Sequence, residues 1–353
     1  MSNNKFIGQI KELDLYKEDT TKVDTKLDLI DKKILYLLGE NGRYSPTALA
    51  NKLRLNRETV AYRINKMNEN DFLHGCLTLL DHRKLNLKNF IVYIKLKTVN
   101  SEKEFIAYLH DLSEVTRLKN CSGSYDIQVI FTVKNEEEFI SLLDKIVDKY
   151  HVIIEDYDFM EILEEDFLGL NLLLEKIDPK DMKISELKGS TFEKEFKLAL
   201  SNVEEVKVDD KDKDILELLK LDGRITIREL STKINLAPIA IENRIKRLVS
   251  SGVIKKFVPL ASISALGYQW WKVFFKFKNV NRNKFFSYIK YHPNILWYMR
   301  FLGRWDYQFS VFAKNNAEFH KILDEIRTEF SDNIISYDSI IVFNQFKYVQ
   351  RVR

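Results

Sequence analysis

Two segments of the sequence carry polar and basic side chains on the face of a predicted helix that its apolar stripe leaves free. In the first segment the stripe is Val60, Ile64 and Met67, which recur at helical spacing. Side chains on the opposite face can donate to phosphates or to base edges, as an arginine does to guanine. The candidates are Asn56, Arg57, Glu58, Thr59, Ala61, Tyr62, Arg63 and Lys66. The pattern predicts a helix that reads double-stranded DNA, and the alternative is the solvated polar face of a helical bundle.

The second segment repeats this arrangement with different exposed residues. Its tip is less polar and its later half is more basic, which favours phosphate contacts over base contacts. The candidates are Pro238, Ile239, Asn243, Arg244, Lys246, Arg247, Lys255 and Lys256. We therefore expect the first segment to supply more of the base discrimination, so that the preferred DNA site is not a perfect palindrome. On this hypothesis Arg57→Ala relaxes specificity, whereas Arg244→Ala weakens binding to all sequences.

Each candidate helix closes a longer stretch that occurs twice, from Asp31 to Leu73 and from Asp212 to Ile254. The two stretches keep every apolar position at a constant offset without a gap. Each predicts three short amphipathic helices that bury their stripes against one another, with the abrupt second turn of a helix-turn-helix. Ser45 is expected to cap the middle helix of the first copy, and Thr226 with Glu229 has capping-box spacing in the second.

A different periodicity follows each of these stretches. Strand-like alternation begins at Phe90 and again near Tyr268, and in each half the predicted order is β-α-β-β-α-β. This order is the ferredoxin-like unit, a four-stranded antiparallel sheet with both helices on one face. The predicted fold class is α+β, with two winged-helix-like helix-turn-helix domains and two ferredoxin-like βαββαβ domains. The open face of each sheet must be covered by another part of the protein.

On this interpretation the chain consists of six segments. We expect an N-terminal arm over 1–26, helix-turn-helix domains over 27–76 and 209–258, ferredoxin-like domains over 77–165 and 259–353, and a linker over 166–208. The linker is not rich in glycine or serine, so it predicts a tether with some structure of its own. Phe192, Phe196 and Ala199 have helical spacing and predict one helix within it.

Composition excludes several classes of protein. The chain has 353 residues, 45% hydrophobic and 31% charged, which is enough for more than one packed core. Its net charge of +4 gives no strong bulk attraction to polyanions, so a nucleic-acid surface requires local segregation of charge. Cys76 and Cys121 predict free buried thiols in a reducing compartment, and no apolar run is long enough to span a bilayer. We expect a cytoplasmic protein with no metal site, no cofactor and no membrane partner.

The sequence resembles the Lrp/AsnC (feast/famine) family of bacterial and archaeal transcription regulators. The resemblance rests on the D..IL..L..(N/D)GR opening, the V..RI..L pattern of the third helix and a G.(Y/W)D hairpin, each present in both halves. Its residues in the two openings and third helices are Asp31, Ile34, Leu35, Leu38, Gly42, Arg43, Val60, Arg63, Ile64 and Met67, and Asp212, Ile215, Leu216, Leu219, Gly223, Arg224, Ile241, Arg244, Ile245 and Leu248. The resemblance implies DNA binding, a ligand-responsive ferredoxin-like (RAM-type) domain, and self-association through the open sheet faces. In this chain the two ferredoxin-like domains could pair internally as a pseudo-dimer made by tandem duplication.

The resemblance also implies an effector site near the G.(Y/W)D hairpins, often for an amino acid. The candidate residues are Gly123, Tyr125, Asp126, Gly303, Trp305 and Asp306. On this interpretation the two aspartates would bind the ammonium group of the ligand. The alternative is structural, with a glycine that permits a tight turn and an aspartate that accepts from turn amides.

Two departures from the family pattern concern the helix-turn-helix turn and the cap of the third helix. The usual glycine of the turn is Arg54 in the first copy and Asn235 in the second. A left-handed backbone there would be strained at Arg54 and easier at Asn235. The usual serine cap is Asn56, which we expect to cap the helix, and Ala237, which cannot.

Two other functions stay open from the sequence. Fused pairs of Lrp/AsnC-like domains also occur as sirohaem decarboxylases, which use histidine and arginine around a tetrapyrrole. The 6 histidines of this chain show no paired spacing, which argues against that chemistry. A DNA-free interaction module built from degenerate regulators is the third interpretation.

Overall fold

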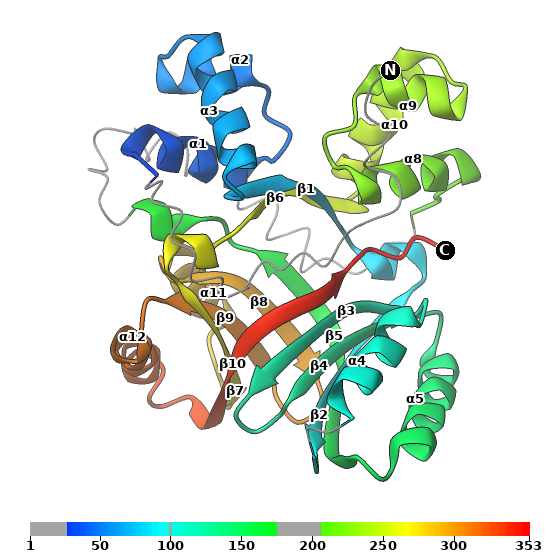
Figure 1. Ribbon diagram of the computed structural model, residues 1–353, viewed down its shortest axis with the longest axis vertical. Helices are drawn as coiled ribbons and strands as arrows, with labels where there is room; N and C mark the ends of the chain where they lie inside the picture. Colours follow the sequence, from blue (N-terminus) through cyan, green and yellow to red (C-terminus); the bar gives the residue numbers. More distant parts are fainter. Residues whose placement is uncertain (1–26, 99–100, 175–205) are drawn as a thin grey trace.

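Two helical heads lie at one end of the molecule and a β-barrel lies at the other, with a two-stranded ribbon between them (Figure 1). The computed structural model describes residues 27–98, 101–174 and 206–353. The arm expected over 1–26 lies outside these residues, as does most of the expected linker with its helix. The predicted α+β class is confirmed.

The first head consists of α1 (Leu29–Glu40), α2 (Pro46–Leu53) and α3 (Arg57–Glu69). Its apolar stripes are buried against one another as predicted. Ser45 Oγ accepts a hydrogen bond from the N–H of Ala48 at 3.1 Å and so caps α2. Asn56 makes no side-chain bond of this kind, so the cap expected for α3 is absent.

The second head consists of α8 (Asp210–Leu221), α9 (Ile227–Ile234) and α10 (Pro238–Ser250). Thr226 and Glu229 form the predicted capping box at α9. The turn before the third helix is left-handed in both heads, as expected, with φ of 56° at Arg54 and 57° at Asn235. The two heads therefore share one backbone plan despite different turn residues.

A ribbon of two antiparallel strands, β1 (Leu73–Leu80) and β6 (Ile254–Ala261), joins the heads. Neither strand was expected from the sequence pattern, and each crosses a domain boundary proposed above. Each strand begins shortly after the third helix of its own head, and Leu77 pairs with Val258 near the middle of the ribbon. The pairing therefore links the two heads directly (Figure 1).

Each half of the chain supplies four strands and two helices to the barrel. The first half supplies β2 (Lys88–Leu96), α4 (Glu102–Asp111), β3 (Val115–Ser122), β4 (Ile127–Val133), α5 (Glu136–Tyr150) and β5 (Ile154–Phe167). The second half supplies β7 (Gln269–Phe277), α11 (Arg282–Tyr291), β8 (Ile295–Leu302), β9 (Tyr307–Ala313), α12 (Asn316–Glu329) and β10 (Ile334–Tyr348). The strand orders β3-β4-β2-β5 and β8-β9-β7-β10 are those of the predicted ferredoxin-like sheets.

The long strands β5 and β10 close the two sheets into one barrel, because β5 pairs with β8 and β10 pairs with β3. The sequence suggested pairing through the open sheet faces, and the structure joins the sheet edges as well. Side chains of both halves fill the interior, among them Tyr93, Phe274 and Trp305. Both apolar sheet faces are therefore covered within one chain.

Short 3-10 helices connect these parts at η1 (His82–Leu85), η2 (Asn171–Leu174) and η4 (Ser264–Leu266). Cys76 and Cys121 are free and buried. Within the described ranges, no helix is both long and apolar enough to cross a membrane.

Candidate nucleic-acid interface and buried cavity

The outer faces of α3 and α10 hold most of the candidate DNA-contacting side chains in solvent. On α3, Tyr62 is 67% exposed and the side chain of Arg57 is 63% exposed. On α10, Ile239 is 62% exposed and the side chain of Lys246 is 68% exposed. Other exposed candidates are Asn56, Glu58, Thr59, Lys66, Pro238, Asn243 and Arg247, whereas Ala61 is half-buried. Each head thus presents one accessible face on its third helix.

Arg63 lies on α3 but its guanidinium group is directed at the start of α1. Its Nη1 donates to Asp28 Oδ2 at 2.6 Å and to Asp31 Oδ1 at 2.9 Å. Burial alone would raise the pKa of Asp28, but hydrogen bonds from the Asp31 N–H and from Arg63 hold it below its usual value. The assignment of Arg63 to DNA is therefore corrected, because this side chain ties the third helix to the first.

Arg244 makes the same contacts in the second head. Its Nη1 donates to Asp209 Oδ2 at 2.7 Å and to Asp212 Oδ1 at 2.8 Å. The carboxylate of Asp212 is fully buried, and Arg247 also pairs with it. An unpaired carboxylate at this depth would be strongly unfavourable. The assignment of Arg244 to DNA phosphate is corrected to a role in the packing of the head.

Lys255 and Lys256 do not belong to the third helix of the second head. Helix α10 ends at Ser250, and both lysines lie on β6. Lys255 Nζ donates to the carbonyl oxygen of Glu165, and Lys256 Nζ donates to that of Phe167 at 3.0 Å. The prediction of DNA contacts is therefore corrected for both residues, which fasten the ribbon to β5 of the barrel.

Two arginines join the heads to each other across the ribbon. Arg43 Nη1 donates to the carbonyl oxygen of Gly223 at 2.7 Å, and its Nη2 donates to that of Ile225 at 3.1 Å. In the opposite direction, Arg224 Nη2 donates to the carbonyl oxygen of Tyr44 at 2.6 Å. Each head supplies both donors and acceptors, so these bonds hold the mutual orientation of the heads in addition to the ribbon.

Gly42 and Gly223 precede these arginines at points where the chain passes close to the ribbon. A Cβ atom at Gly42 would lie 2.6 Å from Cys76 Sγ, and one at Gly223 would lie 2.8 Å from the carbonyl oxygen of Cys76. The N–H of Gly223 donates to that same oxygen at 2.9 Å. Burial raises the pKa of the Cys76 thiol to about 12. At both positions the head lies so close to the ribbon that only glycine fits without a clash.

The aspartates of the two hairpins, proposed as partners of a ligand ammonium, are already engaged. Asp126 accepts from the N–H of Leu96 at 2.8 Å, and Asp306 accepts from the N–H of Phe277 at 2.7 Å. Each also pairs with a lysine of that same neighbouring strand at 3.0 Å. These contacts support the structural alternative, with one difference. The two aspartates accept hydrogen bonds from the neighbouring strand and not from the amides of the turn.

The remaining hairpin residues are packed into the barrel. Tyr125 and Trp305 are each 5% exposed and belong to its interior cluster. Gly123 and Gly303 have φ of 129° and 151°, and a Cβ atom at Gly303 would lie 2.6 Å from Met160 Cγ. The hairpins therefore lock the two halves together, and none of the six candidate effector residues lines the cavity described next.

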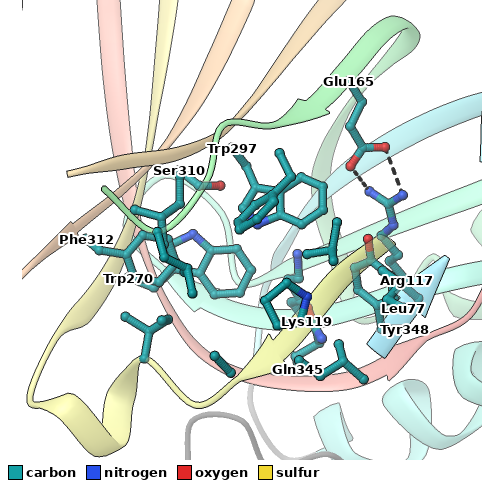
Figure 2. A pocket seen from close by; sticks show the side chains of 18 of the residues that line it. Leu77, Arg117, Lys119, Glu165, Trp270, Trp297, Ser310, Phe312, Gln345 and Tyr348 are labelled. Carbon is teal, nitrogen blue, oxygen red and sulfur yellow. Dashed lines mark hydrogen bonds and ion pairs between the residues drawn. The ribbon is translucent and has the colours of Figure 1, made fainter. Parts of the chain in front are cut away.

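A cavity of about 80 Å³ lies where the mouth of the barrel meets the ribbon (Figure 2). The ribbon contributes apolar side chains such as Leu77 and Val258. The barrel contributes aromatic and charged side chains, namely Arg117, Lys119, Glu165, Trp270, Lys272, Trp297 and Tyr348. The charged residues of this set were not identified from the sequence, although Lys272 interrupts the run from Trp270 to Phe275, which is otherwise apolar and aromatic.

The cationic groups of the cavity are almost fully buried. Arg117 pairs with Glu165 through two bonds, one of them from Nη2 to Oε2 at 2.8 Å. Lys119 Nζ lies 4.2 Å from the centroid of the Trp270 ring, and Lys272 Nζ lies 5.3 Å from it. Burial lowers the pKa of Lys272 to about 7 and, together with repulsion from Lys272, holds the pKa of Lys119 well below its usual value.

A metal centre finds no support in the described part of the chain. No group of three or more histidine, cysteine, aspartate or glutamate side chains there could hold a metal ion. His82 is buried beside Asn89, with 2.9 Å between His82 Nδ1 and Asn89 Nδ2, and burial lowers its pKa to about 4.

Comparison with known proteins adds to this description. The family profile of the AsnC-type helix-turn-helix domain matches residues 27–68, that of a winged helix-turn-helix DNA-binding domain matches 208–255, and that of the Lrp/AsnC ligand binding domain matches 273–352. The crystal structure of the siroheme decarboxylase NirDL has a TM-score of 0.57 over 92% of this chain and 93% of that one. At 13% identity this likeness concerns the fold alone.

Curated relatives are more similar in sequence. The HTH-type transcriptional regulator FL11 of Pyrococcus furiosus is 36% identical over 120 residues, which are 34% of this chain and 80% of FL11. The HTH-type transcriptional regulator LrpC of Bacillus subtilis is 33% identical over 111 residues, which are 31% of this chain and 77% of LrpC. With these relatives matched over most of their length, and with both characteristic domains present, the chain belongs to the Lrp/AsnC family.

Proposed function

We propose that this chain is a sequence-specific, double-stranded DNA-binding transcription regulator that acts as an intrachain pseudo-dimer. One observation carries the proposal: two helix-turn-helix heads, each with an exposed face on its third helix, are fixed to one another by the ribbon and by Arg43 and Arg224. Ordinary helix-turn-helix proteins achieve this arrangement by pairing two chains on two half-sites. The edges of the two ferredoxin-like sheets are paired with each other in the closed barrel.

The exposed faces differ in the contacts that they can make. On α3, Arg57 and Tyr62 are free to reach base edges, and Lys66 lies further along for phosphate. On α10, Lys246 and Arg247 are exposed basic residues, and Arg247 also pairs with Asp212. Lys246 pairs with Glu242 at 2.7 Å, but an exposed ion pair of this kind is weak and can be exchanged for a phosphate contact.

We also propose that the chain is not an enzyme. Curated relatives carry the names of regulators, and the cavity of about 80 Å³ is much smaller than the roughly 300–1,000 Å³ of pockets that hold drug-sized ligands. A tetrapyrrole would require such a larger space. An absorbance titration with sirohaem tests this directly, and we expect no change in its spectrum.

Fluorescence anisotropy on duplexes from the region upstream of the gene tests the DNA-binding proposal. We expect binding that weakens linearly with the logarithm of salt concentration. Lys66→Ala and Lys246→Ala should each reduce the slope of that line by about one, whereas Arg57→Ala should reduce the preference among sequences. Lys321→Ala is the matched control, since Lys321 is 78% exposed on α12 of the barrel. A folded chain that ignores duplex DNA at low salt would overturn the proposal.

A further inference from the structure

The cavity between barrel and ribbon is lined by more buried basic side chains than acidic ones. Arg117 and Lys119 are each 3% exposed and Lys272 is fully buried. The only carboxylate in the lining is that of Glu165, and Arg117 already holds both of its oxygens. Among the described residues no carboxylate forms an ion pair with either lysine, and Glu165 is paired with Arg117. Two amino groups are thus buried without an ion-pair partner, so their protonation is costly unless an anion joins them.

Further donors in the lining lack an acceptor. Arg117 Nε and the hydroxyl group of Tyr348 are buried and have no hydrogen-bond partner within the described structure. Both residues line the cavity, and the guanidinium carbon of Arg117 lies 4.7 Å from the centroid of the Tyr348 ring. Buried donors are normally satisfied, so these atoms favour an acceptor that the chain itself does not provide.

The two halves of the chain contribute different side chains to the cavity, and the cation that the second half supplies is Lys272 of β7. In the paired strands, Arg117 lies opposite Ile130 and Lys119 opposite Gln128, and the same register in the second half places Trp297 opposite Ser310 and Met299 opposite Gln308. The second half therefore has apolar side chains at the two positions where the first half has cations. Figure 2 shows Trp270 and Trp297 beside Lys119 and Arg117 around one hollow.

We propose that this cavity binds a small organic carboxylate that carries a short apolar body and no ammonium group. The carboxylate lies against Lys119 and Lys272, and the apolar body lies against Trp297. An α-amino acid is disfavoured because its ammonium group would meet two lysines and find the only carboxylate occupied. An engineered cavity of 150 Å³ holds benzene, so a volume of about 80 Å³ suits a ligand of three or four carbons.

The cavity lies under the ribbon that links the heads, so a ligand there would contact both the barrel and β1–β6. Any effect of the ligand on DNA binding through the ribbon rests on the proposed function. Ligand binding does not, and it is measured without DNA. A chain that binds the carboxylate and ignores DNA would refute only the proposed function, and a chain that binds DNA and no carboxylate would refute only this inference.

Isothermal titration of the full chain with pyruvate, 2-oxobutanoate and butyrate is the direct test. L-Alanine and L-2-aminobutyrate are the matched probes, since they carry an ammonium group on bodies of the same length, and inorganic phosphate is an anion without an apolar body. We expect at least one of the carboxylates to bind with one site per chain and about tenfold or more tightly than its amino-acid counterpart and than phosphate. Equal or tighter binding of the amino acids or of phosphate would overturn the inference, as would failure of all three carboxylates at millimolar concentration.

Proton uptake gives a second readout. A bound carboxylate favours the charged form of Lys272, whose pKa in the free cavity is about 7, so binding should take up a proton at pH 8 and much less at pH 6. Affinity should correspondingly fall as the pH rises through 7. The groups that face Lys272 from the neighbouring strands are Arg117, Lys119, Cys121, Glu165 and Gln308. Titration in two buffers of different ionisation enthalpy measures the uptake.

Substitutions of the two cavity lysines test whether the carboxylate binds at this site. Lys272→Met and Lys119→Met keep most of the length of the side chain and remove a buried amino group, so neither is expected to impair folding, which circular dichroism checks. Each should weaken carboxylate binding about 10- to 100-fold, and Lys272→Met should also reduce proton uptake. Lys321→Met on α12 should bind as the parent does. Undiminished binding by both cavity variants would show that the carboxylate binds elsewhere and would overturn the inference.

Discussion

The contacts between the heads make a quantitative prediction about DNA binding. Arg43 donates two hydrogen bonds to the second head and Arg224 donates one to the first. A hydrogen bond to a charged group contributes about 1.5–3 kcal/mol, and the lower end applies here because both side chains are only half-buried. The double variant Arg43→Met/Arg224→Met should therefore lose about 4 kcal/mol of contact energy between the heads, while the ribbon stays paired.

The expected effect on affinity follows from the linkage of two binding units. Two rigidly connected heads bind DNA about 10²- to 10⁴-fold more tightly than one head when both half-sites are occupied together. Loosening the heads lowers their effective concentration at the second half-site, so we expect the double variant to bind a duplex with two half-sites about tenfold more weakly. Its affinity for a duplex long enough for one head only should be unchanged.

Fluorescence anisotropy on the two duplexes measures both quantities, with circular dichroism to check the fold. Arg327→Met is the matched control, since Arg327 lies on α12 with its side chain 46% exposed, and its one ion pair among the described residues is with Asp324 at 3.0 Å. An equal loss on both duplexes would mean that the arginines stabilise each head separately. No loss on either would mean that the ribbon alone fixes the heads, and either result refutes the role assigned to these bonds.

Three further predictions concern single positions. Arg54→Gly should stabilise the first head by about 1 kcal/mol in urea unfolding, because it removes a side chain from a left-handed backbone, and Asn235→Gly should gain less because asparagine tolerates that conformation. Arg244→Ala should destabilise the second head by about 1–3 kcal/mol in the same assay, through its buried carboxylate partner, and should leave the salt slope of DNA binding unchanged when measured on folded protein. Cys76 and Cys121, whose pKa values burial raises to about 12, should resist iodoacetamide at pH 8 in the native chain and react in urea, as mass spectrometry would show.

The helices of both heads could be predicted from the sequence because their apolar stripes have no other partner than one another. The cap at Ser45 and the capping box at Thr226 followed from local chemistry and are confirmed. The left-handed turns followed from the family resemblance, since Arg54 by itself argues against that conformation. The cap predicted at Asn56 does not form. Its backbone has the extended conformation of an N-cap residue, but its side chain makes no capping hydrogen bond. Local signals therefore predicted local structure, with this one exception.

Contacts between distant segments could not be predicted in the same way. The strands β1 and β6 lack a regular alternation, and each forms only because the other half of the chain supplies its partner. Arg63 and Arg244 look like phosphate ligands on their own helices, and only the fold places two carboxylates of the first helix beside each. A helical position facing away from the local stripe is therefore not necessarily a position facing solvent.

The cavity illustrates what one continuous chain permits. In a dimer of identical chains, each cation at this position would occur twice around the axis, and the first half alone would place two copies of Arg117 and Lys119 at the barrel mouth. Here the register places Trp297 and Met299 at the equivalent positions of the second half, and Gln345 at the position of Glu165. Arg117, Lys119 and Glu165 therefore occur once each instead of twice, Lys272 of the second half is the one further cation in the lining, and the space loses its two-fold symmetry. Such a site has a single orientation for an amphipathic ligand, which is why one ligand per chain is the expected stoichiometry.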